Sequence, residues 1–265
     1  MTQWVSGILV AIAVILLLLY APKEGVQGVV VVLSLAGLWE YFNITNGGEP
    51  LWIKACGLAL GGGMTALLIF WAGSSDRFPA LFAAALMATL VLHFFGSADF
   101  MVRFRHAAFF YFGVMYVSVL FSFWGKMRGL PEWRFWFFLM LAGTVLSDVG
   151  GYVVGRWIGR HKLAPRISPG KTIEGLIGGV VFTVSAGFVV RFLFLPDFST
   201  APLVIVCIAI AVIGPLGDLS ESLIKRGFGV KDSGRLIPGH GGLLDRVDAL
   251  LFTGPVVYYF AKYFS

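Results

Sequence analysis

The sequence predicts an all-α, polytopic membrane protein that folds as one helical bundle of about nine transmembrane helices. Of its 265 residues, 58% are hydrophobic and only 13% are charged, and the mean hydropathy is +0.87. Soluble domains carry about 25% charged residues and have no need of repeated apolar runs of about 20 residues. We expect helices rather than barrel strands, because the runs are long and uniformly apolar and lipid cannot satisfy open backbone groups.

Nine apolar segments follow one another along the chain and define the expected helices. The first contains "ILVAIAVILLLLY" with no Lys or Arg before it, which favours a retained helix over a cleaved signal peptide. Glycine spacings in later segments, such as Gly151, Gly155 and Gly159, predict close helix packing. The segments are 4–20, 26–44, 51–72, 79–95, 107–124, 133–157, 173–195, 202–224 and 248–264.

Basic residues between these segments predict the orientation of the chain. Loops on one side carry thirteen Lys and Arg residues and loops on the other carry six, so the first set should face the cytoplasm. The net charge of +6 then suits orientation, anionic lipid or a phosphorylated substrate better than nucleic acid, which we do not expect as a partner. The thirteen are Lys54, Arg103, Arg105, Arg156, Arg160, Lys162, Arg166, Lys171, Lys225, Arg226, Lys231, Arg235 and Arg246.

Carboxylates at the membrane edge are the first candidate functional residues, because a charge inside a bilayer is costly. Asp148 lies in "LSDVGGYVVGR", Asp218 in "GPLGDLSESLIKR", and Asp245 and Asp248 in "LLDRVDAL". Asp245 and Asp248 alone could merely complement a helix dipole. Together with Asp218 they predict a Mg²⁺ site, with a second cation left open, because Mg²⁺ takes a few carboxylates beside water and phosphate oxygens. Helical spacing places Asp218 on one stripe with Glu221 or Ser222, and Lys225.

Two glycine-containing segments are candidate phosphate sites. In "PGHGG", the backbone N–H groups of Gly241 and Gly242 can approach anionic oxygens closely, while His240 is equally a phosphate donor or a turn residue. The second segment, "SPGKTIEG", is not a Walker A motif, because Pro165 stands where that motif needs glycine and no strand is expected before it. Two interpretations of this segment stay open. Ser168 and Thr172 could simply cap a helix, or Lys171 could point at a phosphate.

The C-terminal stretch "SESLIKRGFGVKDSGRLIPGHGGLLDRVD" resembles the signature of phosphatidate cytidylyltransferases, also called CDP-diacylglycerol synthases. It contains Ser-x-x-Lys-Arg-x4-Lys-Asp, then Pro-Gly-His-Gly-Gly, then Asp-Arg-x-Asp. Upstream, "DVGGYVVGRWIGRHKLAPRISPGKTIEG" resembles a second stretch of that family, except that Gly151 and Gly170 replace the expected Ala and Lys. The resemblance covers the C-terminal half strongly, whereas residues 1–140 match only as generic apolar helices.

The resemblance implies that CTP and phosphatidic acid give CDP-diacylglycerol and pyrophosphate at the cytoplasmic side of a bacterial inner membrane. Residues 141–265 would form the catalytic region, with cytoplasmic active-site loops 156–172 and 225–247, and residues 1–140 would serve packing, lipid access or oligomer contacts, a homodimer being left open. The implied catalytic residues are Asp218, Lys225, Lys231, Asp232, His240, Asp245 and Asp248, with Asp218, Asp245 and Asp248 as metal ligands. The implied substrate-binding residues are Asp148, Ser168, Lys171, Thr172, Ser222, Arg226, Arg235, Gly241, Gly242 and Arg246.

Two other functions stay open at this point. A CTP-dependent membrane lipid kinase would move the γ-phosphate of CTP onto an alcohol. An ion-coupled transporter would use Asp148 and Asp218 as cation sites, although transporters favour carboxylates near the midplane and often contain inverted repeats, and neither feature is evident in the sequence.

Overall fold

The computed structural model describes residues 16, 19–70, 77–94, 99–234, 236 and 241–264. The predicted segment 4–20 lies almost entirely outside them, and each of the other eight predicted segments corresponds to a helix. The helices are α2 (Lys23–Thr45), α3 (Leu51–Phe70), α4 (Arg77–Leu92), α5 (Phe100–Gly113), the π-helical stretch η1 (Val114–Val119), α6 (Leu120–Met127), α7 (Trp133–Ile158), α8 (Ile173–Phe194), α9 (Thr200–Gly227) and α10 (Leu244–Phe264).

Six described helices are long and apolar enough to cross a membrane, so the protein is a multi-pass membrane protein. They are α2, α3, the continuous helix Phe100–Met127, α7, α8 and α9. The expected number of about nine spans is not reached by this criterion within the described part of the chain, where α4 is a shorter apolar helix.

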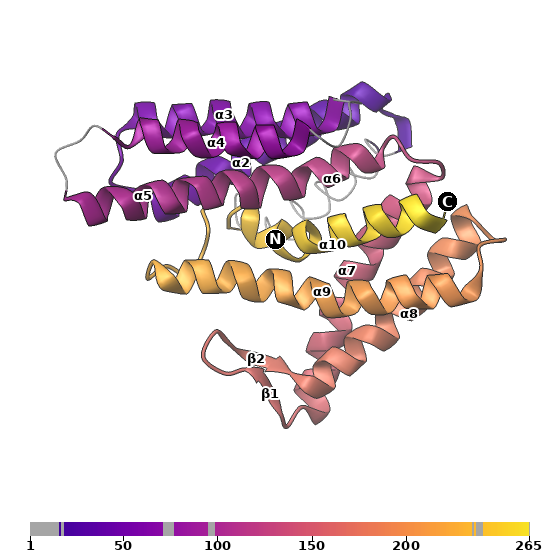
Figure 1. Ribbon diagram of the computed structural model, residues 1–265. Helices are drawn as coiled ribbons and strands as arrows, with labels where there is room; N and C mark the ends of the chain where they lie inside the picture. Colours follow the sequence, from indigo (N-terminus) through magenta and orange to yellow (C-terminus); the bar gives the residue numbers. More distant parts are fainter. Residues whose placement is uncertain are drawn as a thin grey trace.

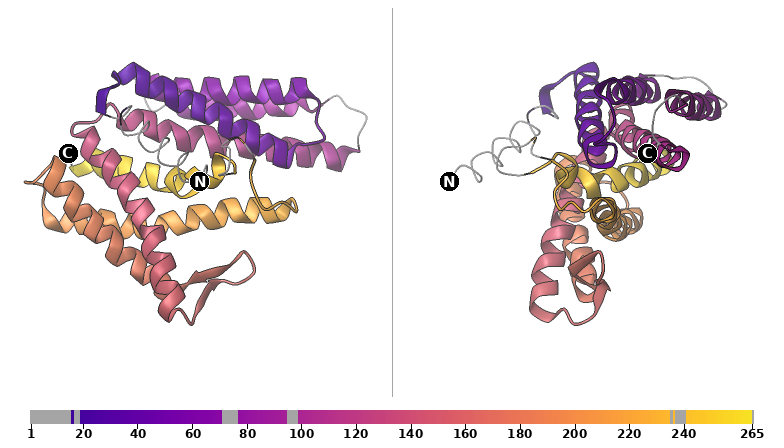
Figure 2. Two further views of the ribbon diagram at one scale, coloured as in Figure 1. Left: turned by 180° about the vertical axis from the view of Figure 1, so that it is seen from behind. Right: turned by 90° about the vertical axis from the view of Figure 1, so that its left-hand side faces the viewer.

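Helix α10 lies in the middle of the bundle. On one side it contacts α9, and on the other it contacts α6 and α2 of the N-terminal half (Figure 1). Helices α7 and α8 pack together beyond α9, at the side away from α3 and α4 (Figure 2). The last helix of the chain therefore joins the N-terminal helices to those that carry most of the predicted site.

Glycines bring α7 and α8 into close contact. A Cβ atom at Gly150 would lie 2.7 Å from the carbonyl oxygen of Gly178, and one at Gly175 would lie 2.6 Å from that of Gly151. Any larger residue would push the two helices apart, which confirms the close packing predicted from the glycine spacing.

The described structure is mostly helical, as predicted, and a short β-hairpin between α7 and α8 is an element that the sequence did not predict. Strands β1 (Lys162–Ala164) and β2 (Ser168–Thr172) pair antiparallel, with an irregular register between Lys162 and Ala164. The hairpin was expected as a loop because its strands are short, polar and lack an alternating apolar pattern. The carboxylate of Glu174 in α8 holds the base of the hairpin, since it accepts hydrogen bonds from the backbone N–H of Arg160 and His161.

The connections place the hairpin and the end of α9 on the same side of the bundle. Helices α8 and α9 are antiparallel and joined by residues 195–199, so this link lies opposite the start of α8, where the hairpin is attached (Figure 1). The hairpin and the described residues 225–234 of the second basic loop therefore lie at one end of the helices.

Candidate active site

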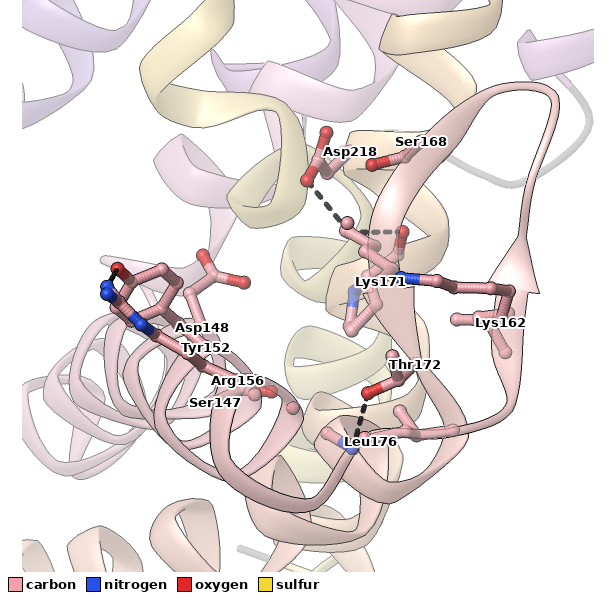
Figure 3. A pocket seen from close by; sticks show the side chains of 17 residues that line it. Ser147, Asp148, Tyr152, Arg156, Lys162, Ser168, Lys171, Thr172, Leu176 and Asp218 are labelled. Carbon is pink, nitrogen blue, oxygen red and sulfur yellow. Dashed lines mark hydrogen bonds and ion pairs between the residues drawn. The ribbon is translucent and has the colours of Figure 1, made fainter.

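A polar cavity of about 630 Å³ opens between α7, the hairpin, the start of α8 and α9 (Figure 3). Five residues predicted from the sequence line it: Asp148 from α7, Ser168, Lys171 and Thr172 from β2, and Asp218 from α9. Two upstream segments of the chain and α9 are thus brought together around one space.

Lys171 connects the hairpin to α9. Its Nζ lies 2.7 Å from Oδ2 of Asp218 and donates a hydrogen bond of 3.1 Å to the carbonyl oxygen of Pro215 (Figure 3). The other carboxylate oxygen of Asp218 accepts a hydrogen bond from the Ser222 hydroxyl, one helical turn away. Asp218 is therefore oriented from both sides, and the cavity has a fixed ion pair at its α9 wall.

Two further cationic side chains line the cavity, and sequence reasoning counted them only for orientation. Lys162 comes from β1 beside Lys171, and the Arg156 guanidinium at the end of α7 donates a hydrogen bond of 2.6 Å to the Tyr152 hydroxyl (Figure 3). Together with Lys171 they place three positive charges around a cavity large enough for a polyphosphate. The position of the hairpin was the missing information, because it brings β1 and β2 to the same space.

The segment around Thr172 resolves one of the alternatives left open by the sequence. The Thr172 Oγ1 accepts a hydrogen bond from the backbone N–H of Gly175, so Thr172 is the N-cap of α8. Ser168 instead lies in β2 and lines the cavity. At Gly170, where the resemblance led us to expect Lys, no described neighbouring atom lies within 4 Å of a Cβ position, so the structure leaves room for a side chain there.

Lys225 and Asp245 form a second charged cluster. The buried Lys225 ammonium pairs with Glu221 and lies 2.5 Å from Oδ1 of Asp245. Oδ2 of Asp245 accepts hydrogen bonds from the backbone N–H groups of Ser233 (2.9 Å) and Gly242 (3.0 Å). The carboxylate of Asp245 is thus bound by the last turn of α9 and by residues 228–243 between α9 and α10, which we call the linking segment.

Asp248 faces a different group of carboxylates. It repels both Asp218 and Asp148 electrostatically, and within the described residues neither Asp148 nor Asp248 forms an ion pair. Helices α9 and α10 cross closely here, since a Cβ at Gly217 would lie 2.5 Å from the carbonyl oxygen of Asp248. Asp248 is thus electrostatically coupled to Asp218 and Asp148, whereas the sequence analysis grouped Asp218 and Asp248 with Asp245 as metal ligands.

No three His, Cys, Asp or Glu side chains of the described residues converge closely enough to hold a metal ion by themselves. The predicted metal ligands Asp218, Asp245 and Asp248 stay a prediction. Carboxylate oxygens remain the donor type that Mg²⁺ prefers, and Mg²⁺ commonly takes only one or two protein carboxylates together with substrate phosphates.

The remaining predicted residues are exposed, lie beside Asp245 or fall outside the described residues. Arg235 and His240 fall outside the described part of the chain. Gly241 has φ +89°, a conformation that favours glycine, and Gly242 is buried against the Asp245 carboxylate. The exposed residues are Arg226, whose guanidinium donates to the carbonyl of Val230, and Lys231, Asp232 and Arg246.

A second cavity, of about 540 Å³, lies between α2, α5 and the end of α9. Its walls are largely apolar and aromatic, with Phe109, Phe112 and Leu223 among them, and it also contains Arg105 and His106. His106 pairs with Glu49. Apolar walls beside a cationic group suit an amphiphile with an anionic head.

Residues 2–264, nearly the whole chain, match the family model of the cytidylyltransferase family. The chain belongs to this family. Over 257 residues, the chain is 35% identical to a phosphatidate cytidylyltransferase of Staphylococcus aureus, a match that covers 92% of the chain and 95% of that protein. It is 40% identical to a phosphatidate cytidylyltransferase of Staphylococcus epidermidis over 173 residues, which are 64% of the chain and 65% of that protein. The uncharacterised Escherichia coli protein YnbB is 47% identical over 124 residues, 47% of the chain and 41% of that protein.

These matches confirm the resemblance to cytidylyltransferases that the C-terminal motifs predicted. With YnbB and the Staphylococcus epidermidis protein, the aligned part covers less than two thirds of the relative's length, and the Staphylococcus aureus match extends over nearly the full chain.

One residue of this cytidylyltransferase-family chain that sequence reasoning missed contacts the site from the N-terminal half. Glu40 of α2 is 3% exposed, and its carboxylate accepts hydrogen bonds from the linking segment and from the start of α10. The available signal was a lone carboxylate near the C-terminal end of the apolar segment 26–44, which is unusual in a membrane helix.

Proposed function

We propose that the protein is an integral-membrane phosphatidate cytidylyltransferase, a nucleotidyltransferase that converts CTP and phosphatidic acid into CDP-diacylglycerol and pyrophosphate for phospholipid synthesis. The observation that carries the proposal is the polar cavity, in which the Lys171–Asp218 pair and Asp148 lie together on the segments that carry the family motifs. The similarity to phosphatidate cytidylyltransferases over most of the chain supports the same substrates. No feature of the structure favours the lipid kinase or the transporter.

The chemistry requires little proton transfer. An oxygen of the lipid phosphate forms a bond to the α-phosphorus of CTP, the bond from that phosphorus to the bridging oxygen breaks, and the electron pair leaves with pyrophosphate. The lipid phosphate is already anionic near neutral pH, so no strong base is needed, and the main obstacle is repulsion between two anions. Lys162, Lys171 and Arg156 supply positive charge around the cavity, where it can neutralise the nucleotide phosphates.

Mg²⁺ is part of the proposal, and a second cation is compatible with it. Asp218 and Asp248, whose carboxylates lie within electrostatic range of each other, would hold the ion together with phosphate oxygens of the nucleotide. When bound, Mg²⁺ supplies positive charge that stabilises the leaving pyrophosphate. Asp148 and Asp218 also repel each other, which is the arrangement expected of carboxylates that share a cation.

The reaction is tested with purified protein in detergent, phosphatidic acid, Mg²⁺ and CTP labelled at either the α- or the γ-phosphorus. We expect the α-label in the lipid extract and the γ-label in pyrophosphate. Transfer of the γ-label into lipid, especially with diacylglycerol in place of phosphatidic acid, would identify a lipid kinase. Absence of CTP turnover with either lipid would refute both enzymes and revive the transporter.

We also propose that the polar cavity faces the cytoplasm, where CTP is present. Single cysteines at Ser199, in the exposed α8–α9 link, and at Arg166, in the exposed hairpin turn, test this in a background without Cys56 and Cys207. Ser233, in the predicted cytoplasmic loop 225–247, is unsuitable because its side chain is buried.

A membrane-impermeant thiol reagent should label position 199 in intact cells and position 166 only after the membrane is broken. The expectation follows from the excess of basic residues in the loops on the hairpin side. The reverse labelling pattern would contradict both the orientation and the access of CTP to the cavity.

A further inference from the structure

Glu40 is a buried carboxylate in the membrane-spanning helix α2, far in sequence from the catalytic motifs. Its exposed fraction is 3%, and its neighbours in α2 are apolar residues such as Leu38, Tyr41 and Phe42. Burial of a carboxylate is costly unless hydrogen bonds compensate for the lost water. The partners of Glu40 therefore indicate why it is there.

Among the described residues, the hydrogen-bond partners of Glu40 belong to the linking segment and the first turn of α10. Oε1 accepts a hydrogen bond of 2.9 Å from the backbone N–H of Leu243. Oε2 accepts one of 2.9 Å from Leu244 N–H and one of 3.1 Å from the Ser233 hydroxyl. The N–H groups at a helix start have no partner within the helix and carry partial positive charge, so a carboxylate there both caps α10 and fixes its position.

Two glycines make this close approach possible. A Cβ atom at Gly234 would lie 2.7 Å from Oε1 of Glu40, and one at Gly242 would lie 2.7 Å from Oε2. Side chains at either position would displace the carboxylate from the backbone N–H groups.

Ser233 connects Glu40 to Asp245. Its hydroxyl, which donates to Glu40, also accepts a hydrogen bond of 3.3 Å from the backbone N–H of Asp245. Its own N–H donates to Oδ2 of Asp245, whose Oδ1 lies 2.5 Å from the Lys225 ammonium. Glu40, Ser233, Asp245 and Lys225 thus form one continuous hydrogen-bonded chain from α2 to α9.

We propose that Glu40 is a positioning residue, which sets the orientation of Asp245 and Lys225 for nucleotidyl transfer through Ser233 and the start of α10. The inference rests on the proposed function. The alternative is that Glu40 only stabilises the fold by capping α10. The two roles differ in whether kcat changes in protein that is folded.

The test compares Glu40→Gln and Ser233→Ala with the wild-type enzyme, at a temperature where thermal unfolding shows each protein to be folded. Glutamine keeps the shape of the side chain but turns an amide N–H₂ toward one of the donors. We expect kcat to fall on the order of ten- to a hundredfold, because small displacements of reacting groups have effects of this size, with KM for CTP within about twofold. The double variant should lose little more than either single variant, because both changes interrupt the same chain.

Ser34→Ala is the matched control. Ser34 is buried in the same helix and shares a 2.8 Å hydrogen bond with Thr65, away from the site. It should lower the melting temperature with kcat unchanged.

If Glu40→Gln and Ser233→Ala behave like Ser34→Ala, the positioning role is overturned and capping alone remains. If Glu40→Gln does not fold, Ser233→Ala decides alone. A wild-type protein without cytidylyl transfer would instead refute the proposed function, so the two failures are distinguishable.

Discussion

Each of the single substitutions Asp218→Asn, Asp245→Asn and Asp248→Asn should lower kcat by about a hundredfold or more, while the protein still inserts and folds. Asp218 lines the polar cavity, Asp248 lies within its electrostatic range, and the two carboxylates would hold Mg²⁺ together with substrate phosphates. Asp245 contributes differently, because its carboxylate pairs with the Lys225 ammonium and accepts hydrogen bonds from the backbone N–H groups of Ser233 and Gly242, between α9 and α10. The measurement is cytidylyl transfer at saturating Mg²⁺ with purified variants.

Asp197→Asn serves as the control for these variants. Asp197 is exposed in the α8–α9 link, at the opposite end of the helices, and its exchange should leave the rate unchanged. Near-normal rates in two of the three site variants would refute the assignment of these carboxylates. A Mg²⁺ titration adds a second readout, since Asp218→Asn and Asp248→Asn should need more Mg²⁺ for half-maximal rate and Asp245→Asn should not.

Lys225→Gln should both destabilise the protein and lower kcat on the order of tenfold or more. Lys225 is buried between Glu221 and Asp245, so its removal leaves two carboxylates without their cation. Removal of one partner from a buried ion pair typically costs about 3–5 kcal/mol. Thermal unfolding and steady-state kinetics with both substrates measure the two effects separately.

The double variant Lys225→Gln, Glu221→Gln separates stability from catalysis. It removes one of the uncompensated charges and should recover much of the melting temperature, but not the rate.

Lys231→Gln is the exposed counterpart and should raise KM for a substrate in a salt-dependent way, because charges at the surface are screened. Unchanged kinetics in both lysine variants would mean that these residues only orient the chain in the membrane.

The helices of this protein could be predicted from the sequence because a membrane helix is encoded by one contiguous apolar run of the chain. Each apolar run is long enough to define its own helix, and glycine spacing predicted close packing of the segments that form α7 and α8, although not that they pack against each other. The hairpin could not be predicted in this way. Its strands Lys162–Ala164 and Ser168–Thr172 pair through the backbone, and their polar side chains leave no periodic pattern.

The sequence predicted which residues belong to the candidate site better than it predicted how they contact one another. Asp148, Lys171 and Asp218 lie around one cavity as expected from their motifs. Asp245 and Asp248 lie one turn apart on the same face of α10, which suggested the same role for both. The described part of the linking segment, however, donates hydrogen bonds to Asp245. Such a fold-back depends on tertiary contacts, which helical periodicity does not contain.

The contact between α2 and α10 has a consequence for exchanging parts between relatives. Glu40 and its partner Leu244 are 204 positions apart in the chain. A chimera that joined residues 141–265 of this protein to the N-terminal helices of a relative would keep every catalytic motif intact. It would hold the start of α10 in place only if the relative's second helix supplied a carboxylate opposite Gly234 and Gly242. One requirement for the compatibility of the two halves therefore lies at the contact between α2 and α10, where a single substitution supplies the carboxylate that a relative lacks.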